Sequence, residues 1–247
     1  MAARAEGSIA LVTGGNRGIG RAFVEELLAR GASKVYMGSR EPVDDLPTGA
    51  ELLLLDVTDT ESVAAAAAVC TDVTVLVNNA GLHTRGRLVL TNDPDGARRE
   101  MEVNYFGVLN MIRAFAPVLA ANGGGAIVNV SSIAGAIPTA FMGGYSSSKA
   151  AGLFLSSIAR AELEPQGTTV TALVVGSVET RMSDHVVGAK EDPSTIAKVG
   201  IAAMGRGERV VDTDQMAIAA RASYALDPVR FERAMAKMLG GPLQTGR

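Results

Sequence analysis

The sequence predicts an α/β protein with a doubly wound parallel sheet, helices on both faces of the sheet, and a single domain of 247 residues. Three observations predict this fold. Short apolar runs alternate with helical patterns, a glycine-rich loop joins the first apolar run to the first helix, and no repeat, linker or low-complexity segment interrupts the alternation. A chain of this length buries a sizeable core without disulfides.

Six strands are expected. They lie near Ile9–Val12, Val35–Met37, Glu51–Leu55, Val73–Val77, Ala126–Val130 and Thr169–Val174, with helices between them. After the sixth strand come helical patterns over Thr213–Tyr224 and Pro228–Leu239, followed by a polar tail. The sequence therefore predicts a sheet that ends at six strands.

The first strand runs into a glycine-rich loop, Thr13 to Gly20, and then into a helix that stops near Gly31. Glycines let a backbone turn tightly and approach a pyrophosphate, and the helix N-terminus offers unpaired N–H groups. An ordinary glycine-rich turn is the alternative, but the flanking strand and helix favour a nucleotide cradle.

Tyr145 and Lys149 are four residues apart, so they share one face of a helix. A nearby ammonium favours a phenolate and moves the pKa of a phenol, ordinarily about 10, toward the range in which acid/base catalysis is efficient. Alone, such a pair occurs on many exposed helices. With the glycine loop, it indicates a proton donor beside a nucleotide site.

Together the two motifs resemble the short-chain dehydrogenase/reductase family in its shorter single-domain branch, with a Rossmann-type sheet, over about Ile9 to Thr180. The ordered matches are Gly14, Gly18 and Gly20, Asp56-Val57, Asn78-Asn79-Ala80-Gly81, Asn104, Ser131-Ser132, and Tyr145 with Lys149. The branch that adds a substrate domain, with epimerases and dehydratases, uses another glycine spacing.

The resemblance implies a role for each matched residue. Tyr145 would exchange a proton with the substrate oxygen, and Ser132 would hydrogen-bond that oxygen. Lys149 would bind the nicotinamide ribose and lower the pKa of Tyr145. The backbone around Asn104 would hold a water that links Lys149 to solvent. The implied activity is reversible reduction of a ketone or aldehyde; the alternative is a non-catalytic, cofactor-sensing regulator on the same fold.

The expected cofactor is NADP(H). The second strand ends in Ser39-Arg40 without the acid that binds the ribose hydroxyl of NAD, so Arg40 and Arg17 would contact a 2′-phosphate. Glu41 leaves an NAD reading open. The implied cofactor contacts are Gly14, Asn16, Arg17, Gly18, Ile19, Gly20, Ser39, Arg40, Asp56, Val57, Asn78, Ala80, Gly81, Tyr145, Lys149, Val178 and Thr180.

The segment after the sixth strand departs from the family pattern. Val175 stands where the family places a proline, so the nicotinamide end of the cofactor would be held less firmly. Residues 181–212 would form a lid over the substrate. His83 and His185 could line the pocket, but exposed positions are expected for both, and neither has the spacing of a metal ligand.

Composition limits the partners. A net charge of −3 gives no basic surface for nucleic acid, and the single cysteine, Cys70, excludes an intrachain disulfide. The uncharged stretch from Ala114 to Ser148 is interrupted by prolines, asparagines and glycines, so no membrane segment is expected. No signal-peptide core precedes the first strand, so the cytoplasm is expected. A homodimer through the helices of Asn104 and Tyr145 is expected, with a tetramer also possible, and no metal site is expected.

Overall fold

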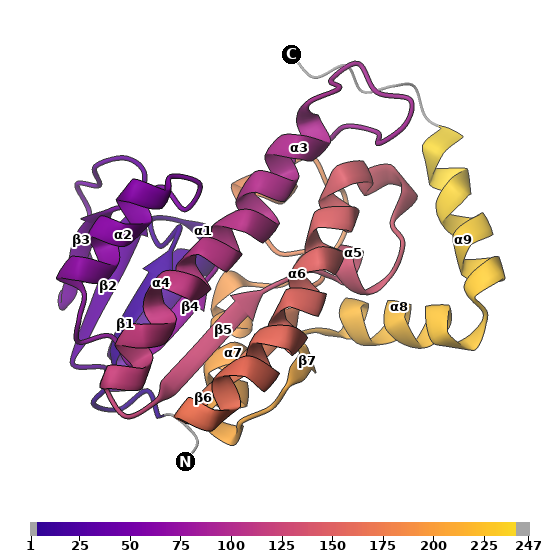
Figure 1. Ribbon diagram of the computed structural model, residues 1–247. Coiled ribbons are helices and arrows are strands. Elements are labelled where there is room, and N and C mark those ends of the chain that lie inside the picture. Colours follow the sequence, from indigo (N-terminus) through magenta and orange to yellow (C-terminus); the bar gives the residue numbers. More distant parts are fainter. Residues whose placement is uncertain (1–3, 241–247) are drawn as a thin grey trace.

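A computed structural model describes residues 4–240 and shows seven parallel strands between two layers of helices (Figure 1). The strand order is β3-β2-β1-β4-β5-β6-β7. The strands are β1 (Ile9–Thr13), β2 (Lys34–Ser39), β3 (Ala50–Leu54), β4 (Val75–Asn78), β5 (Gly125–Val130), β6 (Thr168–Val174) and β7 (Val210–Asp212). The order reverses between β1 and β4, so the carboxyl ends of these strands border a crevice where doubly wound sheets bind ligands.

The helices lie between the strands in sequence and on both faces of the sheet. They are α1 (Gly18–Ala29), α2 (Thr60–Val69), α3 (Gly96–Met101), α4 (Val108–Ala121), α5 (Ile133–Ala136), α6 (Gly143–Leu163), α7 (Pro193–Arg206), α8 (Gln215–Leu226) and α9 (Pro228–Lys237). A π-helical turn, Glu102–Gly107, joins α3 to α4, and short 3-10 turns form at Ala140–Met142, Glu164–Gln166, Arg181–Ser183 and Met238–Gly240.

Alternation along the strands divides the core into two layers. Ala10 and Val12 of β1 face α1 and α7, whereas Leu11 faces the layer of α2, α4 and α6. Because successive side chains of a strand point to opposite faces, one apolar run supplies both layers. In the second layer, Phe115 of α4 and Leu155 of α6 pack with Leu11.

The predicted six-strand sheet is wrong at one edge, where Val210–Asp212 pairs in parallel with Ala172–Val174. This strand has only three residues, and none of them is fully buried. It therefore lacks the apolar run by which a buried strand is recognised. The helical patterns that follow are confirmed as α8 and α9, which stand to one side of the sheet (Figure 1).

The expected lid is partly a core element. Within residues 181–212, α7 packs on α1 and buries Ile196, Ala197 and Met204. A side chain added at Gly200 would lie 2.7 Å from both Leu173 and Phe23, which shows how closely α7 approaches β6 and α1. Only the segment before α7 remains available as a lid.

One continuous helix, Gly96–Ala121, meets the length and hydropathy of a membrane span by composition alone. In the described fold it supplies Met111, Phe115 and Leu119 to the core. These side chains are fully buried. A core helix of this composition passes the same test, so the segment is assigned to the core.

Candidate active site

The glycine loop is built around two residues with positive φ and one close approach. Gly14 and Gly18 have φ of 62° and 54°, a region that favours glycine. A Cβ at Gly20 would lie 2.1 Å from the carbonyl oxygen of Gly14 and 2.4 Å from Asn79 Nδ2. The first turn of α1 can therefore press against the loop only if residue 20 has no side chain. Asn16 and Ile19 lie in this loop and first turn, and Ile19 packs on the core.

Asn79, which sequence reasoning left without a role, fixes this loop to the end of β4. Its Nδ2 donates to the carbonyl oxygens of Thr13 at 2.9 Å and Gly14 at 3.1 Å. The Thr13 hydroxyl in turn accepts from the backbone N–H groups of Asn79 and Ala80. The signal was the repeated asparagine at a strand end, but one strand cannot show which side chain crosses to its neighbour.

Asn78 lies in a different environment. Its Nδ2 donates to Asn129 Oδ1 at 2.8 Å, Asn129 donates to Ser156, and the Asn78 Oδ1 is buried without a partner among the described residues. The side chain therefore joins β4 to β5 and α6 rather than lining the glycine loop.

Three family-matched residues, Ser132, Tyr145 and Lys149, lie close together at the carboxyl edge of the sheet. Ser132 follows β5 and caps α5 by accepting from the Ala134 N–H at 3.2 Å. Tyr145 lies in the first turn of α6, and the Lys149 Nζ lies 5.8 Å from its ring centroid. Lys149 Nζ also donates to the Val130 carbonyl at 2.9 Å. A Cβ at Gly135 would lie 2.5 Å from the Lys149 backbone, so this glycine lets α5 approach α6.

Asn104 sits in the π-helical turn with 1% of its surface exposed. Its Oδ1 accepts from the Leu82 N–H at 2.8 Å, and its Nδ2 donates to the Leu82 carbonyl and to the Ser148 hydroxyl. A Cβ at Gly81 would lie 3.2 Å from Asn104 Oδ1 and 3.6 Å from Lys149 Nζ, so the loop after β4 meets α6 here. π-Turns inside α-helices occur frequently at functional sites.

Burial shifts the pKa values of Tyr145 and Lys149 in opposite directions. Burial raises the pKa of Tyr145 to about 12, Glu100 adds to the shift, and an interaction with the Ser132 hydroxyl opposes it. Burial also lowers the pKa of Lys149 to about 8. Burial is the largest influence on the Tyr145 pKa, and the lysine Nζ donates to the Val130 carbonyl. The expectation that Lys149 lowers the Tyr145 pKa stays a prediction.

Residues for the adenosine end of a dinucleotide follow β2 and β3. Ser39 is buried and accepts from the Glu41 N–H, while Arg40 and Arg17 are exposed. Among residues 4–240, neither arginine forms an ion pair or side-chain hydrogen bond with the chain.

Asp56 and Val57 follow β3. Asp56 Oδ1 accepts from the N–H and hydroxyl of Thr58, and Val57 is buried beneath the π-helical turn, where a Cβ at Gly107 would meet it. Asp59, not Asp56, caps α2 by accepting from the Glu61 N–H.

The loop after β6 closes the crevice opposite the glycine loop. A Cβ at Gly18 would lie 3.1 Å from the Thr180 Cγ2, and Val178 is buried against the core. Thr180 also caps the turn Arg181–Ser183.

This loop is firmly held without the family's proline. The Gly176 N–H donates to Asp214 Oδ2 at 2.8 Å, and the Val175 carbonyl accepts from Ile133. Asp214 also caps α8. Sequence reasoning missed Asp214, although an aspartate at a helix start is a recognised cap.

The two histidines differ. His185 is exposed, as expected. His83 is not: its ring is partly buried, with its centroid 4.8 Å from that of Tyr145, and burial lowers its pKa to about 4, with His185 and Arg85 adding to the shift.

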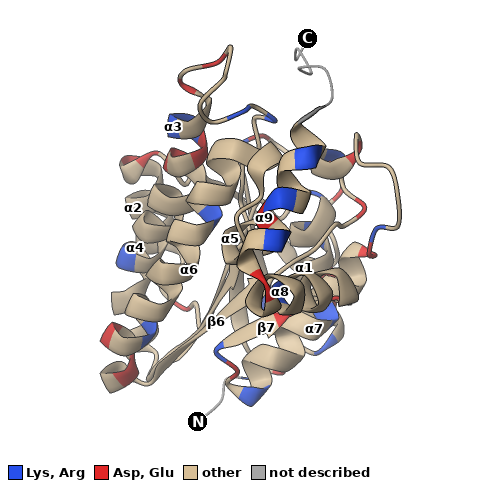
Figure 2. Cartoon of the chain, turned by 90° about the vertical axis from the view of Figure 1, so that its right-hand side faces the viewer, with Lys and Arg blue, Asp and Glu red and all other residues tan. Residues whose placement is uncertain are grey.

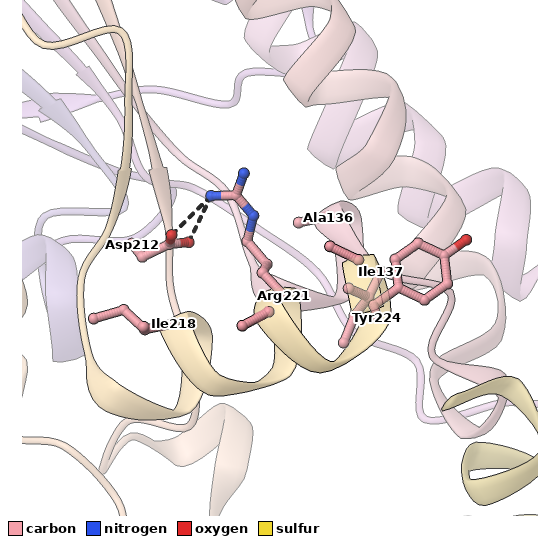
Figure 3. A pocket seen from close by; sticks show the side chains of 8 residues that line it. Ala136, Ile137, Asp212, Ile218, Arg221 and Tyr224 are labelled. Carbon is pink, nitrogen blue, oxygen red and sulfur yellow. Dashed lines mark hydrogen bonds and ion pairs between the residues drawn. The ribbon is translucent and has the colours of Figure 1, made fainter. Parts of the chain in front are cut away.

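A pocket of about 460 Å³ lies outside this constellation, between α5 and α8 (Figure 3). Arg221 donates to both oxygens of Asp212 at 2.8 Å in its wall, and Ile218 and Tyr224 line it. Because none of the family-matched residues lines it, we locate the candidate site by Tyr145 and the glycine loop. No group of three or more metal-ligating side chains occurs in the described part of the chain.

Known proteins match over most of this chain. A short chain dehydrogenase from Burkholderia cenocepacia, whose crystal structure is in complex with NADP, is 40% identical, covers 97% of this chain and 100% of its own, and superposes with a TM-score of 0.88. The 3-oxoacyl-(acyl-carrier-protein) reductase FabG of Vibrio cholerae is 31% identical over 229 residues, which is 89% of this chain and 93% of the relative. A 3-alpha-(or 20-beta)-hydroxysteroid dehydrogenase of Mycobacterium bovis is 33% identical, covering 88% of this chain and 84% of the relative.

A family model described as short chain dehydrogenase matches residues 8–191. This range contains the glycine loop, the Asn-Asn-Ala-Gly segment, and Ser132, Tyr145 and Lys149. The seven-stranded sheet and the order of these motifs agree with that match. This chain belongs to the short chain dehydrogenase family of oxidoreductases.

Proposed function

We propose that the protein reduces a ketone or aldehyde to an alcohol with NADPH, reversibly, and that Ser132, Tyr145, Lys149 and Asn104 form its catalytic set. One observation carries this proposal. The ring of Tyr145, the hydroxyl of Ser132 and the ammonium of Lys149 meet at the carboxyl edge of the sheet, beside Gly81 and across the crevice from the glycine loop.

The residues of the crevice fit a dinucleotide. Gly14, Gly18 and Gly20 let the loop, the first turn of α1 and the segments beside them pack closely, because a Cβ at any of the three would meet Ala80, Thr180 or the Gly14 carbonyl. No side chain caps the N-terminus of α1 within the described residues, so its first N–H groups are available to a pyrophosphate. When bound, the nicotinamide supplies the hydride for the carbonyl carbon. Thr180 and Gly81 would border its nicotinamide end, and Lys149 would reach the ribose.

The protonation state of Tyr145 suits reduction. With a pKa near 12, the phenol stays protonated at neutral pH, which is the form that can donate a proton to the developing alkoxide. Ser132 supplies a second hydrogen bond to that oxygen. Lys149, charged below about pH 8, adds a positive charge on the same side of the site. The reverse direction needs the phenolate and therefore higher pH.

Two exposed arginines support NADP over NAD. Arg40 follows β2, Arg17 precedes α1, and both guanidinium groups are free of ion pairs within residues 4–240. Arginine forks match phosphate oxygens, so both can contact a 2′-phosphate. The related Burkholderia enzyme, crystallised with NADP, supports the same cofactor.

One named relative is a 3-oxoacyl reductase and another is a hydroxysteroid dehydrogenase. Their names indicate a ketone or the corresponding alcohol as substrate, and we assign a carbonyl substrate of that general kind to this protein.

A homodimer is proposed through the layer of α4 and α6. There Phe154 and Ile158 are 75% and 56% exposed one turn apart, and most of the α6 ribbon has the colour of uncharged residues (Figure 2).

The test is oxidation of NADPH with a panel of ketones and aldehydes. The wild-type protein should consume NADPH with at least one of them, and Tyr145→Phe should lower kcat by about a thousandfold, because it removes the proton donor. NADP binding, followed by calorimetry, should be retained because the ring stays in place. NADP binding without turnover of any carbonyl, unchanged in Tyr145→Phe, would instead identify a cofactor-sensing regulator.

A further inference from the structure

His83 occupies a fixed place in the loop after β4. The residue before it, Leu82, is held at both its N–H and its carbonyl by Asn104, each at 2.8 Å. The residue after it, Thr84, donates its N–H at 2.7 Å and its hydroxyl at 3.0 Å to Glu100 Oε1. Glu100 and Asn104 are four residues apart on one continuous helix, and both are buried. The backbone on either side of His83 is therefore clamped to the same helix face.

The clamp sets the imidazole against the catalytic tyrosine. The ring centroids of His83 and Tyr145 are 4.8 Å apart with an interplanar angle of 41°, and His185 of the segment before α7 lies 6.2 Å away. Arg85 joins the same two segments by donating to Asp184 at 2.7 Å and to the Met182 carbonyl at 3.3 Å. His83 therefore lies where these two segments meet, beside the ring of Tyr145.

Nε2 of His83 is buried and has no hydrogen-bond partner among the described residues. An unpaired buried polar atom is costly, and in folded proteins such atoms call for a specific explanation. An apolar ring would pack on Tyr145 without that cost. A histidine here therefore lowers the folding stability, and its Nε2 bonds to no described group of the protein.

We propose that His83 is a specificity-determining substrate-binding residue whose Nε2 hydrogen-bonds a second oxygen of the substrate, a carbonyl or hydroxyl close to the carbonyl that Tyr145 protonates. This inference rests on the proposed function for the identity of the reacting group. The expected substrates are ketones that carry a second oxygen close to the reacting carbonyl, as opposed to simple alkyl ketones. The low pKa of His83 keeps the ring neutral near pH 7, so it offers hydrogen bonding without charge.

The experiment compares ethyl acetoacetate with methyl pentyl ketone, which has the same chain length but lacks the ester oxygens. Binding of each compound to the protein–NADP⁺ complex is measured by calorimetry, which needs no turnover. The wild type should bind the ester at least about tenfold more tightly, the value of one well-placed hydrogen bond. His83→Phe, which keeps the ring packing, should reduce that preference to within about threefold. His83→Gln, which keeps a polar group at similar reach, should retain most of it.

The matched control is His185→Phe, the same substitution at the neighbouring histidine, and it should keep the preference. The proposal is overturned if the wild type shows no preference or binds neither ketone, if His83→Phe retains the preference, or if His185→Phe abolishes it equally. A preference that depends on His83, together with no consumption of NADPH on either ketone, would support the binding site and reject the reductase function.

Discussion

At the scale of single residues, burial governs the chemistry of the candidate site. Tyr145 and Lys149 expose 8% and 6% of their surface, and burial shifts each pKa toward the uncharged form. The neutral phenol is thereby available as a proton donor at neutral pH. The charged form of Lys149, by contrast, destabilises the folded protein because the ammonium is buried.

Lys149→Met should change the free energy of unfolding by an amount that depends on pH. The folded pKa of Lys149, about 8, lies below the ordinary 10.5, so unfolding takes up a proton between these values. The destabilisation is complete below about pH 8 and disappears as the pH rises toward 10.5. Urea unfolding should therefore show the variant more stable than the wild type by up to about 3 kcal/mol at pH 7, less any loss of packing. The difference should shrink by pH 10, and a difference that is constant with pH would contradict the buried charge.

Arg40→Ala tests the cofactor assignment at a residue that forms no ion pair within residues 4–240. Loss of a charge-assisted hydrogen bond to a phosphate should weaken NADPH binding by roughly tenfold or more. NADH, which has no 2′-phosphate, should bind the variant and the wild type alike. Fluorescence titration with both cofactors gives the ratio. A wild type that binds NADH as tightly as NADPH would reject the assignment.

At the scale of elements, the crevice depends on loops that pack against one another rather than on any single motif. The first turn of α1 touches the glycine loop at Gly20, and Asn79 ties that loop to β4. Asp214, at the start of α8, holds the loop after β6 through Gly176. Two strand ends and one distant helix therefore determine the shape of the cofactor site.

Gly20→Ala should break this packing. A methyl group 2.1 Å from the Gly14 carbonyl forces the loop and α1 apart, so we expect a loss of about 1 to 3 kcal/mol in unfolding free energy. NADP binding should weaken at least tenfold, because α1 can no longer approach the phosphates. Gly152→Ala is the matched control, since its Cβ would meet only the Asn104 carbonyl at an ordinary 3.5 Å. Retention of wild-type NADP affinity in Gly20→Ala would contradict the close approach.

At the scale of the whole molecule, the apolar surface of α6 indicates how two copies would associate. Phe154 and Ile158 project from the layer that also carries Phe106, which is 43% exposed. Exposed apolar groups that cluster on one face mark interaction surfaces. The same helix carries Tyr145 in its first turn, so association through α6 would stabilise the helix that holds this residue.

Phe154→Glu should convert a dimer into a monomer, because burying an unpaired carboxylate at an apolar interface is costly. Light scattering of the wild type should give about twice the chain mass of 25.4 kDa, and the variant should give the mass of a single chain. Val69→Glu, on the exposed end of α2, introduces the same charge elsewhere and should leave the dimer intact. A monomeric wild type would contradict this assembly.

What the sequence determined by itself is local or ordered along the chain. The six apolar runs became strands because a buried strand leaves a continuous apolar signature, and the glycine spacing with Tyr145 and Lys149 was recognisable because each motif lies within a few residues. These features were sufficient for the fold class and family. The functional roles of the individual site residues remain predictions.

Only the tertiary structure decided which groups meet. The three-residue strand β7 exists through its pairing with β6, α7 packs in the core because α1 and β6 offer it a surface, and burial raises the Tyr145 pKa although a lysine lies one turn away. His83 became significant because Asn104, Glu100 and Tyr145 surround it from elsewhere in the chain. Burial and contacts between distant segments are properties of the packed chain, and no local pattern records them.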